Sequence, residues 1–332
     1  MEIHNINSCY IDDKDLLFFD VFIKDSLLYI VKPLYYKPTP RLESWQIRLN
    51  GVPVLLSENK ISLNWRTETE NGEPCWVTTY EIAGKPQDVY DVFIKVKEIT
   101  SSFQLVPHRE EKKLFSVATL FKYDIGEYKS WYDYYKKQGV DHFYVYYNGT
   151  LDDAQKRILD RDDVTLINWD FRYVNFPLLS KPPEGSHYKY GHHAQPAQIN
   201  HAFRLFNDDY ILFCDFDEYL EWTHGTLRDM IIEHPDVDIF GFRNCWAKPG
   251  FWSDYIYYDD PLPYPIRAKN IYKRSSVKHA IKIHSPAVTK GYNIKSDLNM
   301  YHFHKTNESK RLFENKNIYP PLDYKNYKYL EW

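Results

Sequence analysis

From residue 114 onward, short apolar runs alternate with segments of helical periodicity, and this alternation restricts the possible fold more than any other feature. Apolar runs of this length predict buried strands, and the intervening amphipathic segments predict helices. Such alternation is typical of a mostly parallel, Rossmann-like α/β sheet flanked by helices. The predicted strands are 114–121, 140–147, 164–169, 211–214 and 237–244, and the predicted helices are 125–138, 151–159, 194–206 and 225–234.

The first third of the chain has a different pattern. Short, aromatic and β-branched segments are separated by turn residues such as Asn50-Gly51 and Asn71-Gly72. Short strands at this spacing predict an all-β, sandwich-like domain. The charged run His108–Lys113 reads as a linker. We therefore divide the chain into a β-sandwich-like accessory domain, residues 1–108, and an α/β domain, residues 109–332.

Bulk composition excludes several classes of protein. The net charge is −4 and Lys and Arg form no basic block, so we expect no nucleic-acid partner. No segment reaches the roughly 18 apolar residues of a membrane span, and residues 1–12 lack the apolar core of a signal peptide. Four scattered Cys residues form no disulfide framework, which favours a reducing compartment. We expect a cytoplasmic protein, of bacterial or viral origin.

The chemistry is indicated by an acidic cluster at the end of one predicted strand. The apolar run Ile211–Cys214 leads directly into Asp215, Phe216, Asp217 and Glu218. In open α/β sheets, ligands bind at the carboxyl ends of strands. Closely spaced carboxylates repel one another unless a cation lies between them, and oxygen ligands suit Mg²⁺ or Mn²⁺. The cluster therefore predicts a metal ion that holds a diphosphate.

Four blocks of sequence together resemble glycosyltransferase family 92 over residues 112–306. Trp131–Tyr146 is similar to that family's helix followed by Gly-Val-x-His-Phe, and Gln195–Glu218 is similar to its Gln-x-x-x-x-x-His helix followed by Asp-x-Asp-Glu. Lys278–Lys282 and His302–His304 resemble two later stretches, with Lys282 and His304 standing where the family has Arg. These departures bear on the identity of the sugar donor.

The resemblance implies a function and a fold. It implies a GT-A fold, a divalent metal and inverting transfer of a sugar from a nucleotide-sugar donor to a glycan acceptor hydroxyl. UDP-galactose is the donor that the family suggests. Plant members of the family carry a β-sandwich module before the catalytic domain, which agrees with the pattern of residues 1–108. The sequence makes no prediction of the oligomeric state.

The resemblance also assigns metal ligands. The second acid of the motif, Asp217, is expected to bind the metal directly, whereas Asp215 is expected to contact the ribose or to reach the metal through water. His302 is the candidate third ligand, with His304 as the fallback because alternate residues of a strand share a face. An imidazole ligand favours Mn²⁺ over Mg²⁺.

Inversion requires a general base within hydrogen-bond reach of the acceptor hydroxyl. We expect it in the loop after the strand at 237–244, and we favour Asp254, which lies beside Trp252, on which an acceptor ring can stack. Asp259 and Asp260 are alternatives in the same region, and Glu218 is a rival base.

Donor-binding residues are expected at the ends of the first two strands, on the helix before the acids and in the Lys278 block. Amide and main-chain groups there can read the base, and Lys side chains can meet the diphosphate as point charges. The candidates are Lys122, Asp124, Asn148, Gln195, Gln198, Asp215 and Lys278.

Other functions stay open at this point. A carbohydrate-binding protein with a structural divalent cation accounts for the acids without any nucleotide. A retaining transferase on the same fold accounts for the motif with the opposite stereochemistry. Haloacid-dehalogenase-like phosphatases also place Asp-x-Asp after a strand, but they require Thr or Val where this chain has Tyr219.

Overall fold

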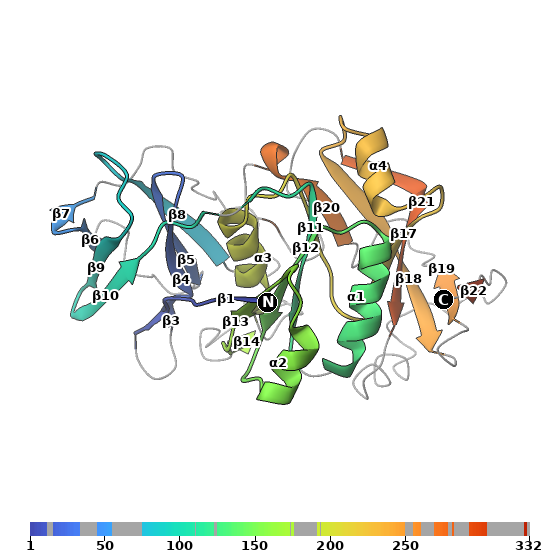
Figure 1. Cartoon of the computed structure of the whole chain (residues 1–332), viewed down its shortest axis with the longest axis horizontal. Coiled ribbons are helices and arrows are strands. Elements are labelled where there is room, and N and C mark those ends of the chain that lie inside the picture. The colour runs from blue at the N-terminus through green and yellow to red at the C-terminus, as the bar shows by residue number, and fades with distance from the viewer. Residues whose placement is uncertain are drawn as a thin grey trace, which may run out of the picture.

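The structure is a computed structural model with two lobes. Figure 1 shows the strands between residues 16 and 105 gathered at one end of the molecule and a larger α/β lobe beside them. The described residues are 1–11, 16–33, 45–54, 75–109, 111–122, 125–172, 174–175, 191–192, 194–249, 255–259, 269–277, 281, 292–303 and 329–330.

The larger lobe is built on one 11-stranded sheet. Its first five strands run parallel, and the next strand, β20, is antiparallel to β16. Two further strands, β17 (Glu218–Trp222) and β21 (Tyr292–Phe303), pair with each other, and β21 also pairs with β18. The main order is β1 (Glu2–His4), β13 (Val164–Asn168), β12 (His142–Tyr147), β11 (Phe115–Phe121), β16 (Tyr210–Phe213), β20 (Lys269–Lys273), β18 (Ile239–Pro249), β19 (Tyr255–Asp259) and β22 (Tyr329–Leu330).

Helices cover both faces of the parallel part of this sheet, which explains the nearly continuous apolar strands. In β12, Phe143 and Val145 pack in the same apolar cluster as helix α1, whereas Tyr144 and Tyr146 pack in the cluster that contains α3. Alternate residues of a strand point to opposite faces, so both sets are buried. The predicted α/β class is confirmed.

The helical segments are η4 (Ile125–Glu127), α1 (Tyr128–Lys137), α2 (Asp153–Leu159), α3 (Ala194–Leu205), α4 (Leu227–Glu233) and η5 (Arg274–Ser276).

The N-terminal lobe contains two antiparallel sheets around one apolar core, as the sandwich-like pattern predicted. Val21 and Ile23 of one sheet share this core with Val92 and Ile94 of the other. One sheet consists of β4 (Asp20–Lys24), β5 (Leu27–Pro33) and β8 (Cys75–Glu81), and the other of β10 (Ile99–Leu105), β9 (Tyr90–Val96), β6 (Trp45–Leu49) and β7 (Val52–Pro53). Two short pairs complete the elements: β2 (Cys9–Tyr10) with β3 (Leu16–Phe18), and β14 (Val174–Asn175) with β15 (Gly191–His192).

The two lobes pack against each other through strand β4 and helix α3. The side chain of Phe22 lies in the cluster that contains α3, and Lys24 Nζ donates hydrogen bonds to the main-chain oxygens of Arg204 and Phe206, both at 3.0 Å. A cation at a helix C-terminus satisfies carbonyl groups that lack helical partners. Strand β1, although first in the sequence, pairs with β13 of the large sheet. The division at residue 108 stays a prediction.

Several local elements differ from the sequence predictions. Strands β17, β20 and β21 were not predicted, because each carries charged residues at positions that a local pattern assigns to turns. The helix predicted at 225–234 is shorter in the structure and begins at Leu227. Thr226 is its N-cap and forms a capping box with Asp229, which satisfies the first free N–H groups of the helix.

The end of helix α1 provides a test of backbone strain. Gly139 follows the helix with a φ of 84°, and an added Cβ would lie 2.5 Å from Cβ of Arg228. Gly139→Ala is therefore expected to destabilise the chain by about 3 kcal/mol, through both backbone strain and overlap. Gly51 has a φ of 78° but open space around it, so Gly51→Ala should cost only about 1 kcal/mol. Equal falls in Tm for the two variants would contradict the predicted overlap.

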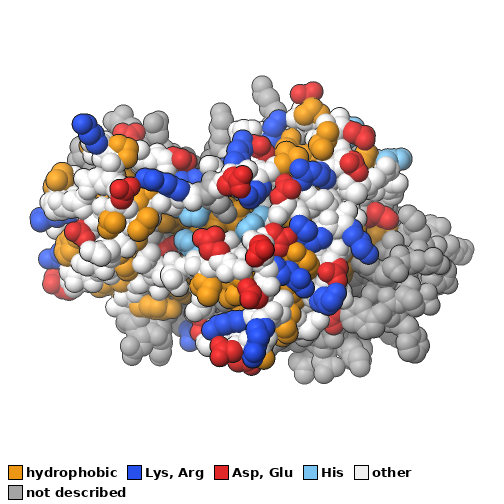
Figure 2. Space-filling view, in the orientation of Figure 1, with side chains coloured by type: hydrophobic (Ala, Val, Ile, Leu, Met, Phe, Trp, Pro, Cys, Tyr) orange, Lys and Arg blue, Asp and Glu red, His pale blue; other side chains and the backbone are white. Residues whose placement is uncertain are grey.

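Surface and membrane features add two observations. Figure 2 shows Lys and Arg side chains interspersed with Asp and Glu over the face that it displays. Within the described ranges, none of the helices combines the length and the apolar character needed to cross a bilayer.

Candidate functional site

The Asp-x-Asp turn is anchored by its middle residue. The ring of Phe216 lies 4.2 Å from that of Phe121 and 5.0 Å from that of Trp131, measured between centroids. This aromatic pocket under helix α1 buries Phe216, while Asp215 and Asp217 stay partly exposed on either side of it. Burial of the apolar residue therefore fixes the turn and directs its two neighbours away from the core.

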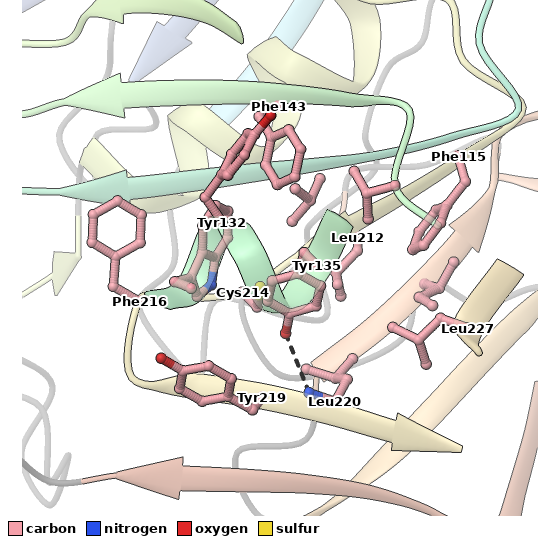
Figure 3. Close-up of a cluster of buried hydrophobic side chains, with 14 of the residues drawn as sticks. Phe115, Tyr132, Tyr135, Phe143, Leu212, Cys214, Phe216, Tyr219, Leu220 and Leu227 are labelled. Carbon is pink, nitrogen blue, oxygen red and sulfur yellow. Dashed lines mark hydrogen bonds between the residues drawn. The ribbon is translucent and has the colours of Figure 1, made fainter. Parts of the chain in front are cut away.

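Helix α1 also holds the strand that follows the turn. Tyr135 Oη donates a hydrogen bond to the main-chain oxygen of Glu218 at 3.0 Å and accepts one from the main-chain N–H of Leu220 at 3.2 Å. Tyr134 Oη donates to the main-chain oxygen of Leu220 at 2.7 Å. Figure 3 shows Tyr135 pointing from α1 to the start of β17. These bonds set the position of Glu218.

A lysine that the sequence analysis missed lies among the acids. Lys269 Nζ is 2.9 Å from Asp215 Oδ2 and 3.0 Å from Glu218 Oε2, and its side chain is 3% exposed. Burial by itself lowers the pKa of Lys269, but the two carboxylates outweigh this effect and raise it well above its ordinary value. Lys269 is therefore charged and neutralises part of the acidic cluster.

The sheet register explains how this lysine arrives there. Strand β20 pairs antiparallel with β16, with Tyr210 opposite Lys273 and Leu212 opposite Ile271. Continuing the same register by two residues brings Lys269 level with Cys214, next to the first acid. The local sequence gave no indication of this role, because Lys269 begins a short segment that also ends in Lys, and such a residue looks the same at a site as at the surface.

Asp217 faces a histidine from the far end of the chain. His302 lies opposite Glu218 in the pairing of β17 with β21. Its Nε2 is 3.5 Å from Asp217 Oδ2, and its Nδ1 is 3.7 Å from Glu218 Oε1. Burial alone lowers the pKa of His302, but the two carboxylates raise it above its ordinary value. Burial alone raises the pKa of Asp217, but His302 lowers it below the ordinary value.

The two motif aspartates therefore have different environments. Both oxygens of Asp215 accept hydrogen bonds, one from Lys269 and the other from Gln195 Nε2 at 3.1 Å. Asp217 has its carboxylate against an imidazole, and the side chains of both aspartates are 34% exposed. Asp217 therefore differs from Asp215 in its histidine partner and not in its exposure.

Glu218 is the most enclosed of the acids. Its side chain is 1% exposed, and its Oε2 accepts a hydrogen bond from the main-chain N–H of Asp215 at 2.8 Å. Its Oε1 is buried without a hydrogen bond in the described part of the chain. Burial raises the pKa of Glu218 to about 7, an effect that Lys269 opposes and Asp215 reinforces.

Both donor-binding candidates on helix α3, Gln195 and Gln198, are buried. Gln195 contacts Asp215 as described, and Gln198 lies one turn later on the same side of the helix. Among the described residues no acceptor is within hydrogen-bond distance of Gln198 Nε2. A buried amide of this kind normally has a partner, so Gln198 is suited to meet a ligand.

The candidates at the strand ends have contrasting surroundings. Asn148, after β12, is buried, and its Nδ2 donates to the main-chain oxygens of Trp169 at 2.9 Å and Phe171 at 2.6 Å. Its amide hydrogens therefore hold the segment after β13. Lys122, after β11, is exposed. Five further predicted residues lie outside the described residues: Asp124, Asp254, the alternative base Asp260, Lys278 and the fallback ligand His304.

The tyrosine contact beneath the site can be tested. Tyr135→Phe removes the hydroxyl that bonds Glu218 and Leu220, which leaves buried main-chain groups without that partner. We expect a loss of about 1–3 kcal/mol and a lower Tm. Tyr80 is also buried, but its hydroxyl makes no hydrogen bond within the described residues. Tyr80→Phe should change stability by less than about 0.5 kcal/mol, and a similar effect of both variants would rule out the proposed role of Tyr135.

Comparison with known proteins identifies the family. The model of glycosyltransferase family 92 matches residues 112–318, more than half of the chain. The chain therefore belongs to glycosyltransferase family 92. Among curated proteins, none is significantly similar in sequence.

Three solved structures of other proteins are distantly similar to this chain. Residues 1–349 of S. aureus TarS are 14% identical with a TM-score of 0.33, over 57% of this chain and 60% of that one. The same protein in complex with UDP-GlcNAc is 13% identical with a TM-score of 0.33, over 58% and 59%. The mannosyltransferase Ktr4p from S. cerevisiae is 9% identical with a TM-score of 0.23, over 40% of each chain. This chain thus spans about 60% of the TarS structures, and scores this low support no functional inference.

Proposed function

We propose that this glycosyltransferase moves a sugar from a UDP-sugar to a glycan acceptor hydroxyl, with inversion and with the help of a divalent metal ion. The observation that carries the proposal is the pair formed by Asp217 and His302 at the end of a parallel-sheet strand, with Oδ2 and Nε2 3.5 Å apart. Galactose, suggested by the family, is the sugar to test first.

The residues present fit a divalent cation. A carboxylate oxygen and an imidazole nitrogen are suitable ligands for Mn²⁺, and metals of this class share their shell with substrate phosphates. Two ligands from the protein leave room for phosphate oxygens and water. When bound, the ion neutralises charge on the departing diphosphate. His302 must lose its proton to bind, so the ion and the proton compete for the same nitrogen.

The neighbouring groups have separate roles in this proposal. Lys269 and Gln195 hold both oxygens of Asp215, which favours contact with the donor ribose over direct metal binding. Lys269 also keeps Asp215 and Glu218 from repelling each other. Gln198 offers an amide to the donor from the helix behind the acids.

Burial argues against Glu218 as the general base. A base must come within hydrogen-bond reach of the acceptor hydroxyl, and the Glu218 side chain is 1% exposed and bonded to Lys269. We therefore assign Glu218 to orienting the turn, through its bond to the Asp215 N–H. Asp254 remains the proposed base.

A donor panel tests the function. We expect UDP release from one UDP-sugar in the presence of Mn²⁺, loss of release with EDTA and recovery when Mn²⁺ is restored. UDP with Mn²⁺ should raise Tm, because a ligand that binds only the folded state stabilises it. Stabilisation by sugars and metal but by no nucleotide would instead support a carbohydrate-binding protein. The anomeric configuration of the product, read by NMR, separates inversion from retention.

A further inference from the structure

A second group of possible metal ligands lies where the two lobes meet. His4 of β1, Asp20 of β4 and His201 of α3 each offer one ligand atom, and these atoms all lie within 4.8 Å of one another. The group is separate in sequence from the acidic turn at 215–218. None of its members has a part in the proposed transfer reaction.

Hydrogen bonds hold two of the three side chains in place. His201 Nε2 is 2.8 Å from Asp20 Oδ2, and the other ring nitrogen, Nδ1, is 2.7 Å from Tyr146 Oη. The second carboxylate oxygen, Oδ1, accepts from the main-chain N–H groups of Asn7 at 2.6 Å and Val21 at 2.8 Å. Such outer contacts on a histidine and a carboxylate are typical of metal sites, where they orient the ligands.

The charge of the group favours a cation. Burial by itself raises the pKa of Asp20, but His201 and His4 together outweigh this effect and hold the pKa at about 2. Burial lowers the pKa of His201 below its ordinary value. Asp20 is fully buried, and no Lys or Arg in the described part of the chain forms an ion pair with it. A buried carboxylate without a cation is costly.

His4 supplies the third possible ligand atom, its ring nitrogen Nε2. Its Nε2 is buried, lies 3.8 Å from Asp20 Oδ2 and makes no hydrogen bond with the described residues. Its side chain as a whole is 18% exposed. Figure 2 shows histidine side chains at the surface between the N-terminal lobe and the larger part of the molecule.

From this geometry we infer that His4, Asp20 and His201 bind a zinc ion through His4 Nε2, Asp20 Oδ2 and His201 Nε2, with water as the fourth ligand. Tetrahedral zinc with bonds of about 2.0–2.1 Å places its ligand atoms roughly 3.3 Å apart. The separations from Asp20 Oδ2, 2.8 Å to His201 Nε2 and 3.8 Å to His4 Nε2, lie on either side of that value. Two imidazoles and one carboxylate are ligands that suit zinc.

The ion would join three elements that are distant in sequence. Strand β1 belongs to the large sheet, β4 to the N-terminal lobe, and α3 is the helix that precedes the Asp-x-Asp strand. Zinc binding would therefore stabilise the contact between the lobes as well as the fold.

The site is tested by titrating the chain with zinc. The chain carries no tag, and a chelator first removes any bound metal. The Asp217→Asn variant serves as the background, so that the proposed catalytic metal does not contribute. We expect one zinc ion per chain, a rise in Tm on adding zinc and, with Co²⁺ as the probe, the intense visible absorption of a tetrahedral site. His4→Ala should weaken zinc binding by at least about 100-fold, since loss of an outer contact alone costs 10- to 100-fold.

Control measurements distinguish this site from zinc bound at surface histidines and from a loss of folding. His224→Ala removes an exposed histidine outside the group and should bind zinc like the background. His4→Ala should keep its metal-free circular dichroism, because Nε2 forms no hydrogen bond that the fold depends on. Unchanged zinc affinity in His4→Ala, or the absence of a tetrahedral cobalt spectrum in the background chain, would overturn the inference. Neither outcome bears on sugar transfer, because the two sites share no residue.

Discussion

Asp217→Asn is expected to reduce sugar transfer by at least about 1,000-fold and to leave the fold intact. The substitution keeps the shape of the side chain but removes the charge that binds the metal beside His302. Charge stabilisation by a metal contributes several kcal/mol, and about 4 kcal/mol corresponds to a factor of 1,000 in rate. The side chain is 34% exposed, so its loss should have little effect on stability.

The measurement is UDP release by parent and variant at saturating Mn²⁺, together with Tm with and without UDP. We expect the variant to keep the Tm of the parent without ligand and to lose the rise produced by UDP with Mn²⁺. Asp236→Asn removes an exposed acid that lies outside the acidic turn at 215–218, and this variant should behave like the parent. Full activity of Asp217→Asn would exclude this residue as the metal ligand.

Lys269→Met is expected to have the largest effect on stability. The lysine is 3% exposed and contacts both Asp215 and Glu218. Removing it leaves two carboxylates together without a cation, and breaking a buried ion pair from one side costs about 3–5 kcal/mol. The Tm should fall by roughly 10 °C, and transfer should be lost with the arrangement of the acids.

A second substitution tests the electrostatic cause. Adding Glu218→Gln to Lys269→Met removes one of the two stranded charges, so the double variant should recover part of the lost stability. Lys273→Met, at the other end of the same strand, removes only a hydrogen bond to the main-chain oxygen of Pro235 and should cost about 1 kcal/mol. A double variant no more stable than Lys269→Met would show that packing, and not charge, explains the effect.

The fold class was predictable because its signals are local. The buried strands of the parallel sheet appear as apolar runs, and Gly139 marks the end of α1 as predicted. Strands with mixed composition were missed. Strand β17 begins with Glu218, and β20 begins and ends with Lys, so neither has the period of a strand in its own sequence.

The candidate site was predictable only in part. Asp215, Asp217 and Glu218 adjoin one another in sequence, so their clustering needed no tertiary information. The resemblance supplied His302 and Gln195, which the structure brings to Asp217 and Asp215 respectively. Lys269 had no such signal, and the proximity of His4, Asp20 and His201 had none either.

The sequence alone determined the apolar strands, the helices between them and the acidic turn, because hydrophobic periodicity and neighbouring residues are properties of short segments. The tertiary structure decided which distant charges meet. Lys269 reaches Asp215 because β20 pairs antiparallel with β16, and His302 reaches Asp217 because β21 pairs with β17. Strand pairing depends on burial over the whole sheet, so no short segment of the chain specifies it.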